Sequence, residues 1–271
     1  MERRVQEGSV DEHRVEEHRV DGPQGCLFAR SWHPEAAAGA PFLLLHDSLG
    51  SVALWRDFPA RLARATGRAV VAYDRLGFGG SDPYPGALAP DFIRAEADTV
   101  RHLAARLGLG RLILLGHSVG GGMAVCTAAR WPDLCAALVT VSAQALIEPR
   151  TLAGIRAARE AFARPGQIER LARYHGDKAR WVLDAWTETW LAPSRAGWTL
   201  DDDLRGVACP LLALHGDRDE FGSRRQPERI AALAAGPSEA VILEECGHVP
   251  HRERPDAVLA AVGRLLDRGP A

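Results

Sequence analysis

The chain has 271 residues, of which 46% are hydrophobic and 25% are charged, and its formal net charge is -2. A nearly neutral chain has no general electrostatic affinity for nucleic acid or anionic membranes, so we expect neither as a partner. No apolar run approaches the roughly 20 residues that span a membrane, and the N-terminal residues do not resemble a secretion signal. The composition favours a cytoplasmic globular protein, a monomer or homodimer, that acts on a small molecule.

The cysteines argue for the same compartment. Cys26, Cys126, Cys135, Cys209 and Cys246 are odd in number and show no C-x-x-C spacing. Neither a disulfide framework nor a zinc site is indicated, so we expect reduced thiols and no metal.

Residues 1–24 are predicted to form a polar tail that runs into a first strand. Within them the near-repeat EHRV places His13 and His18 five residues apart. Such a pair could suggest a metal site, but a tail followed by a strand and turn is the interpretation we favour.

From residue 41 onward the pattern becomes regular. Short apolar runs have continuous rather than alternating hydrophobicity, which is typical of strands buried on both faces of a sheet. Amphipathic segments with helical spacing lie between most of these runs. Strands alternating with helices predict one α/β domain with a mainly parallel, twisted sheet flanked by helices. The predicted strands are 41–46, 69–74, 111–116, 137–142, 210–216 and 239–245.

The strand signals stop between residues 147 and 205, where the sequence is helical and rich in Arg and Trp. We predict a helical insertion there, with the α/β core formed by residues 25–146 and 206–271. Ligands of open α/β sheets bind beyond the carboxyl ends of the strands, so an insertion that leaves after the strand 137–142 is placed as a lid over that site.

Ser118 lies in Gly-His-Ser-Val-Gly, between a predicted buried strand and a small-residue helix. A G-x-S-x-G pentapeptide also arises by chance, but in this context it predicts a tight turn that exposes a nucleophilic serine. A serine hydroxyl needs a base oriented by a carboxylate. Both are available after later strands, at Asp217 or Asp219 and at His248.

Four motifs in the expected order resemble the α/β-hydrolase superfamily from about residue 25 to the end. They are HDSLGS at 46–51, DRLGFGGSD at 74–82, the pentapeptide around Ser118, and GHVPHRERP at 247–255. The resemblance implies the α/β-hydrolase fold and a Ser-Asp-His triad that needs no cofactor. It selects Asp219 over Asp217, which we expect to tighten its own turn.

The same resemblance selects His248 among the candidate bases. We expect His251 at the rim of the site, His117 in a packing role beside the nucleophile, and His46 holding the neighbouring loop by hydrogen bonds. The backbone N–H groups of Val119 and Ser48 would form the oxyanion hole. Asp47 stands where the family usually has Gly, which puts the Ser48 donor in question.

The predicted function is a serine hydrolase that cleaves an ester or thioester of a small to medium, partly apolar substrate through an acyl-enzyme on Ser118. A serine nucleophile argues against haloalkane dehalogenase and epoxide hydrolase chemistry, which the superfamily runs through an Asp ester. Lactone or carbon–carbon bond hydrolysis, menaquinone-type lyase chemistry and perhydrolase chemistry use the same triad and stay open, as does a non-catalytic receptor.

The insertion supplies candidate pocket residues. Val182, Trp186 and Trp190 share one helical face and could wall an apolar acyl pocket, although packing of the lid on the sheet would explain them as well. We interpret its arginines as a solvated helical surface. They are Arg150, Arg156, Arg159, Arg164, Arg170, Arg173 and Arg180.

Overall fold

A mixed, twisted sheet organises the chain in the computed structural model, which describes residues 3–5 and 13–268. Within these residues the sheet has nine strands in the order β1-β2-β3-β5-β4-β6-β7-β8-β9. β4 to β9 pair in parallel, whereas β1, β2 and β3 pair antiparallel and extend one edge. The strands are β1 (Arg3–Val5), β2 (His13–Gly22), β3 (Gly25–Pro34), β4 (Phe42–Leu45), β5 (Val70–Tyr73), β6 (Leu112–His117), β7 (Cys135–Val141), β8 (Leu211–Gly216) and β9 (Ser238–Leu243).

The predicted α/β architecture is confirmed, and the six predicted strands correspond to β4–β9. The hydrophobic runs located them because every residue of β4 to β8 is buried, as expected for strands covered on both faces. The hairpin β2–β3 was only partly anticipated. Residues 3–5 of the expected tail form β1 against β2, and residues 1–2 and 6–12 lie outside the described residues.

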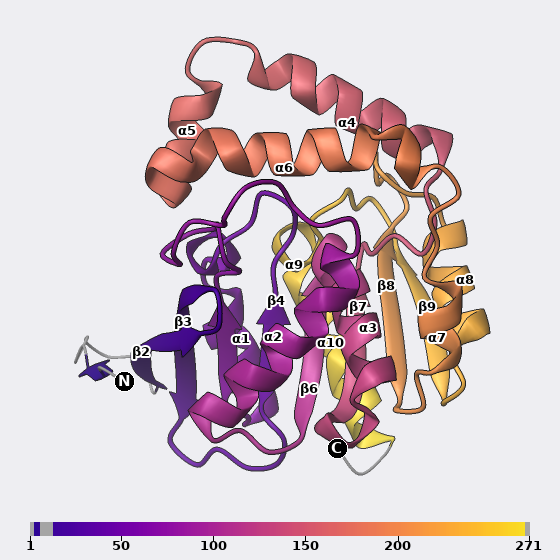
Figure 1. Ribbon diagram of the computed structural model, residues 1–271. Helices are drawn as coiled ribbons and strands as arrows, with labels where there is room; N and C mark the ends of the chain where they lie inside the picture. Colours follow the sequence, from indigo (N-terminus) through magenta and orange to yellow (C-terminus); the bar gives the residue numbers. More distant parts are fainter. Residues whose placement is uncertain (1–2, 6–12, 269–271) are drawn as a thin grey trace.

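Helices cover both faces of the sheet (Figure 1). Two buried hydrophobic clusters result, one on each face. α1 (Phe58–Thr66) and α10 (Pro255–Asp267) pack on one face, and α2 (Phe92–Leu107), α3 (Val119–Arg130), α7 (Asp201–Arg205) and α8 (Arg225–Leu233) pack on the other. Short elements complete the core. They are α9 (Pro250–Glu253), η1 (Val52–Trp55), η2 (Pro132–Leu134) and η4 (Pro193–Arg195).

The remaining helices cross the carboxyl ends of the parallel strands (Figure 1). They are α4 (Pro149–Phe162), α5 (Gln167–His175), η3 (Gly176–Lys178) and α6 (Ala179–Leu191). The segment leaves and re-enters the core side by side, because Leu146 forms a β-bridge with Thr199. Leu200 and Leu204, inside the predicted 147–205 insertion, lie in the core cluster with α3. The exact limits of a lid domain stay a prediction.

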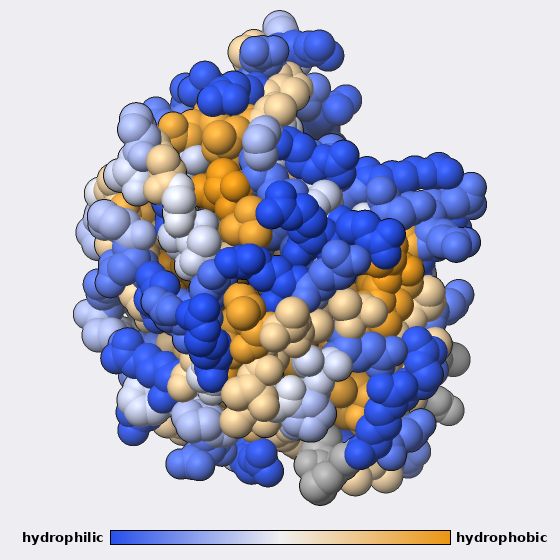
Figure 2. Space-filling model, turned by 90° about the vertical axis from the view of Figure 1, so that its right-hand side faces the viewer, coloured by the Kyte–Doolittle hydropathy of each residue, from blue (hydrophilic) through white to orange (hydrophobic). Residues whose placement is uncertain are grey.

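The surface is mostly polar. On the face that carries α7 and α8, apolar residues reach the surface in separate groups with hydrophilic residues between them (Figure 2). Within the described chain, none of the helices has both the length and the apolar character needed to cross a lipid bilayer.

Candidate active site

Ser118 occupies a strained turn between β6 and α3. Its φ of 54° and ψ of -123° lie in a region that side chains other than Gly rarely adopt. The turn is also too tight for larger neighbours. A Cβ on Gly116 would lie 2.2 Å from the carbonyl oxygen of Gly120, and one on Gly120 would lie 2.2 Å from that of Leu45. These contacts explain both glycines of the pentapeptide and the exposure of the serine hydroxyl toward the site.

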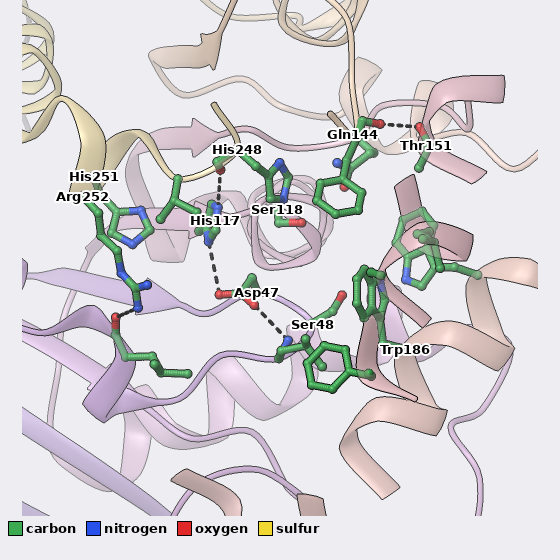
Figure 3. Close-up of a pocket in the computed structure, with 18 residues that line it drawn as sticks. Asp47, Ser48, His117, Ser118, Gln144, Thr151, Trp186, His248, His251 and Arg252 are labelled. Carbon is green, nitrogen blue, oxygen red and sulfur yellow. Dashed lines mark hydrogen bonds and ion pairs between the residues drawn. The ribbon is translucent and has the colours of Figure 1, made fainter. Parts of the chain in front are cut away.

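His248 and Asp219 lie at the ends of two further parallel strands and contact each other directly. His248 Nδ1 is 2.8 Å from Asp219 Oδ2 and 2.9 Å from Oδ1. The His248 ring stands beside Ser118 in the same cavity (Figure 3). The structure therefore brings together the three residues selected from the sequence, in the arrangement of a nucleophile, a base and an orienting acid.

The charge states follow from this pairing. Burial would raise the pKa of Asp219, but the hydrogen bond and charge of His248 outweigh burial and lower it. Burial would likewise lower the pKa of His248, yet the hydrogen bond and charge of Asp219 raise it. The pair favours an ionised Asp219 and a strongly basic His248.

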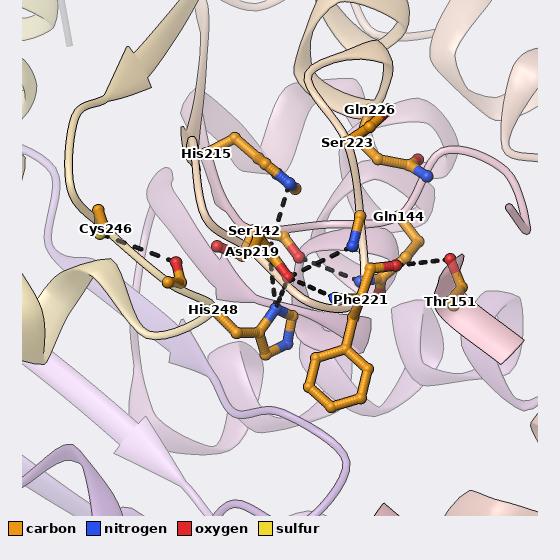
Figure 4. Close-up of polar contacts among 12 residues, drawn as sticks. Ser142, Gln144, Thr151, His215, Asp219, Phe221, Ser223, Gln226, Cys246 and His248 are labelled. Atoms are coloured by element: carbon orange, nitrogen blue, oxygen red, sulfur yellow. Dashed lines mark hydrogen bonds and ion pairs between the residues drawn. The ribbon is translucent and has the colours of Figure 1, made fainter. Parts of the chain in front are cut away.

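A dense set of contacts fixes the Asp219 loop (Figure 4). The carboxylate accepts the N–H groups of Phe221 at 2.8 Å and Gly222 at 3.3 Å, and His215 Nε2 lies 3.2 Å from it. The Phe221 ring meets the His248 ring edge-on, with centroids 4.7 Å apart. Asp219 is held by its own loop before any substrate arrives, which is the preorganisation that a triad acid needs.

One expectation about neighbouring residues needs an addition and another needs correction. Asp217 does more than the expected tightening of its own turn, because its Oδ1 accepts the N–H of Cys246 at 3.0 Å and so ties the acid loop to the His248 loop. His251 is not an exposed rim residue. It is 5% exposed and packs between Trp55 and His117, with ring centroids at 4.7 and 4.8 Å.

Asp47 organises the expected oxyanion loop. Its Oδ1 accepts the N–H of Leu49 at 2.8 Å, and its Oδ2 lies 3.3 Å from His117 Nδ1. His117 Nε2 in turn donates to the backbone oxygen of His248 at 2.8 Å. The two ring nitrogens of His117 thus contact oxygens from two different loops. We expected His117 only to pack beside the nucleophile. Its two polar contacts in addition link three loops of the site.

His46 behaves as expected and holds the same loop. Its Nδ1 donates to the oxygen of Asp47 at 2.8 Å, and its Nε2 accepts the N–H of Arg75 at 3.1 Å. Burial lowers its pKa, in keeping with this neutral tautomer. Ser48 and Val119 flank the site, and the N–H of Val119 is one of the first amides of α3, which lack intrahelical acceptors.

The residues around Ser118 enclose a cavity of about 340 Å³. Trp186 and Trp190 line it, together with Ile155 and Phe162 of α4. Val182 does not, because it is buried inside the lid with Leu171 and Leu183. Trp186 lies on the side of the cavity opposite His251 and Arg252 (Figure 3).

The lid is hydrogen-bonded to the catalytic loops at two places. Near its start, Arg150 donates to the backbone oxygens of Asp219 and Gly222, so this arginine is not merely part of a solvated surface. At the end of α5, in the middle of the lid sequence, His175 Nε2 donates to the oxygen of Leu49 at 3.0 Å, and its Nδ1 accepts the N–H of Gly79. Each of the two contacts therefore helps to position one loop of the site.

Several supporting residues were not assigned a role from the sequence. Glu253 accepts the N–H groups of Gly247 and Val249 at 2.6 and 2.9 Å, and so fixes the His248 loop from both sides. Its place in the closing motif was the available signal. Glu148, His175 and Phe221 carry no local signal, because their partners lie far along the chain.

Metal binding has no support in the donor set. No group of three or more His, Cys, Asp or Glu residues suited to a metal ion occurs within residues 3–5 and 13–268. His18, one of the two histidines near the N-terminus, is buried and its Nε2 lies 2.8 Å from Ser31 Oγ on the neighbouring strand.

Comparison with known proteins agrees with this geometry. A family model described as "Alpha/beta hydrolase family" matches residues 42–261. The sn-1-specific diacylglycerol lipase ABHD11 of Danio rerio is 34% identical over 101 residues, which are 37% of this chain and 31% of the relative. The first such relatives are thus matched over about a third of their length.

Two other similarities extend over most of the chain. The 2-hydroxy-6-oxo-2,4-heptadienoate hydrolase of Pseudomonas putida is 28% identical over 243 residues, covering 79% of this chain and 84% of the relative. The crystal structure of a membrane phospholipase A, described as a bacterial virulence factor, superimposes with a TM-score of 0.76 and 25% identity. It covers 93% of this chain and 86% of that chain.

Proposed function

The chain belongs to the alpha/beta hydrolase family, and on that premise we propose that it is a serine hydrolase acting on carboxylic esters or thioesters of small to medium, partly apolar compounds. The proposal rests on Ser118, which lies in a strained turn beside the His248 ring. The Nδ1 atom of that ring is 2.8 Å from Asp219 Oδ2. This is the set of groups that activates a hydroxyl for attack on a carbonyl carbon.

The proposed reaction has two steps. Ser118 Oγ bonds to the carbonyl carbon while His248 Nε2 takes its proton, and the N–H groups of Val119 and Ser48 stabilise the oxyanion. His248 returns the proton to the leaving alcohol or thiol as the carbon–oxygen or carbon–sulfur bond breaks. Water then attacks the acyl-enzyme with His248 again as base, which releases the acid and restores Ser118.

The environment favours a partly apolar substrate. Ile155, Phe162, Trp186 and Trp190 wall the lid side of the cavity, whereas Arg252 and the histidines form its opposite side. The odd cysteine number and the free thiols of all five cysteines support a reducing, cytoplasmic location as part of the proposal. A small acyl compound is the only partner that the proposal requires.

A second chemistry has specific support. The relative matched over 79% of this chain is named a 2-hydroxy-6-oxo-2,4-heptadienoate hydrolase, a carbon–carbon bond hydrolase by its substrate. The same three residues would serve that reaction or the opening of a lactone. A receptor without catalysis is disfavoured, because ligand binding alone gives no reason to hold an acid, a base and a serine at separate strand ends.

Ester turnover tests the proposal. We expect hydrolysis of p-nitrophenyl acetate and butanoate by the wild type, and a loss of roughly 10³-fold or more in kcat for Ser118→Ala, whose fold is checked by circular dichroism. Equal turnover by both proteins would overturn the proposal. Product analysis with a lactone and with a vinylogous β-diketone then separates ester hydrolysis from the second chemistry.

A further inference from the structure

A second large cavity lies next to the active site and is not used by the proposed chemistry. This outer cavity measures about 380 Å³ and is enclosed by the β2–β3 turn, the loop between β5 and α2, and the first half of α2. Leu27, Leu76, Tyr84 and Leu88 are among its apolar walls. In Figure 1 that loop lies beneath the lid, and the ring of Tyr84 stacks on Trp181 of α6 at 5.5 Å.

A small third pocket, here called the neck, lies between the two cavities. It shares Ser48, Trp186 and Trp190 with the active-site cavity and shares Arg75, Phe78, Leu88 and Phe92 with the outer cavity. Its remaining walls are Val119 and Ala185. The shared walls place the neck between the expected oxyanion donors and the start of α2.

The neck is small and mainly apolar. Its free volume is about 10 Å³, which is room for roughly one water-sized group. The walls are mainly aromatic and aliphatic, and the Arg75 guanidinium lies over the Phe78 ring, 4.0 Å from its centre. An unbranched methylene chain is the apolar group that needs the least room there, whereas a branched or ring-bearing group needs more.

The position of the base decides which arm of an ester enters the neck. His248 lines the active-site cavity but not the neck. The leaving group must lie on the His248 side, because that residue protonates it. The acyl arm then points the other way, past Val119 and Ser48.

We propose that the outer cavity is an acyl-chain site, and that the protein selects esters or thioesters of unbranched, medium-length acids whose carbonyl lies at Ser118 and whose tail passes through the neck. The inference rests on the proposed function and adds the substrate class. The outer end of the cavity is polar, with Asp98, Thr99 and His102, so the end of the tail meets water there.

The test compares p-nitrophenyl butanoate, octanoate and dodecanoate as substrates. In the wild type kcat/KM should rise with chain length, by up to about fourfold for each methylene that becomes buried. Leu88→Trp fills the junction of the neck and outer cavity and should lower the dodecanoate-to-butanoate ratio at least tenfold, roughly the effect of blocking two buried methylenes. Ala87→Trp introduces the same side chain one residue away, at a position that lines none of these three cavities, and should keep the wild-type ratio.

A second blocking variant is needed in case Leu88→Trp does not fold. Ala95 is exposed on α2 and lines the outer cavity, so Ala95→Trp fills that space without touching the core. It should lower dodecanoate turnover relative to octanoate. The inference would be overturned if Leu88→Trp and Ala95→Trp both kept the wild-type chain-length ratios, or if kcat/KM of the wild type did not rise with chain length. Butanoate turnover that depends on Ser118 would still support the proposed function in that case.

Binding separates the inference from catalysis altogether. Calorimetric titration of the Ser118→Ala protein with dodecanoate should show binding. The affinity for dodecanoate should fall at least tenfold when Leu88→Trp is added and should stay unchanged when Ala87→Trp is added. Absence of dodecanoate binding would refute the acyl-chain site whether or not any ester is hydrolysed.

Discussion

Neighbouring carboxylates, Asp219 first among them, together outweigh burial in setting the pKa of His248. Taken alone, the buried position of His248 would lower its pKa, but the Asp219 carboxylate at 2.8 Å raises it. A base works only when unprotonated, so activity should be present above the pKa of His248 and be lost as the pH falls through it. With the pKa above its ordinary value of about 6.5, the acid limb lies above that pH.

Asp219→Asn tests this assignment. Without the carboxylate the pKa of His248 falls, so the acid limb of kcat/KM should move to lower pH, while kcat drops by roughly 10⁴-fold because the imidazole loses its tautomer. The pH profile of p-nitrophenyl butanoate hydrolysis measures both. Asp217→Asn is the matched control and should keep the wild-type midpoint. If the midpoint of the acid limb of kcat/KM were unchanged in Asp219→Asn, a group other than His248 would determine that limb.

Asp47 gives this protein a feature that departs from the usual family pattern. Its carboxylate holds Leu49 within the oxyanion loop and faces His117, which itself donates to the backbone of His248. Burial would raise the pKa of Asp47, but His117 outweighs burial and lowers it, so the residue is ionised at neutral pH. The charge that raised doubt about the Ser48 donor is thus directed at His117.

Asp47→Asn keeps an oxygen for the Leu49 N–H but removes the charge opposite His117. We expect kcat to fall by about 10- to 100-fold, because the oxyanion donors lose their fixed position, with a smaller change in KM. Steady-state kinetics with p-nitrophenyl butanoate provides the readout, and circular dichroism checks that the variant is folded. A wild-type kcat in folded Asp47→Asn would show that the charge opposite His117 does not position the oxyanion donors.

At the scale of elements, the lid and the catalytic loops form one bonded unit. Glu148 caps α4 and accepts the N–H and hydroxyl of Ser223 at 2.8 and 2.7 Å, and Gln226 Nε2 at 2.7 Å. The lid therefore begins at the loop that carries Asp219. At the end of α5, His175 contacts the oxyanion loop, so opening the lid would disturb both halves of the site.

Glu148→Ala should reveal this coupling. Loss of the cap and of charged hydrogen bonds should lower the free energy of unfolding by about 1–3 kcal/mol, measured with urea, and reduce kcat/KM as well. Burial would raise the pKa of Glu148, but its hydrogen bonds lower it, so the contribution is present at neutral pH and lost as the pH falls through the folded pKa. The difference between the two proteins should shrink in acid.

Glu160→Ala is the control in the same helix, because Glu160 is exposed and far from the cap. It should leave stability and kcat/KM unchanged. Equal effects of the two substitutions would mean that α4 helicity, and not the bond to the acid loop, supports activity.

The elements that could be predicted are those with a local signal. β4 to β8 are buried throughout, so their hydrophobic runs identified them, and the two glycines of the tight turn marked Ser118. The supporting contacts carry no such signal. Glu148 meets Ser223 across 75 positions, and His175 meets Leu49 across 126, so only the folded chain brings them together.

On the scale of the whole molecule, the fold assembles the site from distant parts of the sequence. Ser118 follows β6, Asp219 follows β8 and His248 follows β9, and parallel strands place their carboxyl ends at one edge. The family resemblance predicted which Asp and His would be selected, and the structure places those two together. The neck and outer cavity depend on side-chain packing between the lid and the β5–α2 loop, which no local pattern reveals.

The most direct measurement is labelling with a fluorophosphonate, followed by peptide mass spectrometry, of the wild type, Ser118→Ala and His248→Ala. We expect one adduct, on Ser118, formed rapidly in the wild type, absent in Ser118→Ala and strongly slowed in His248→Ala. Labelling of another residue, or equally fast labelling of Ser118 without His248, would contradict the claim that these side chains form an activated nucleophile.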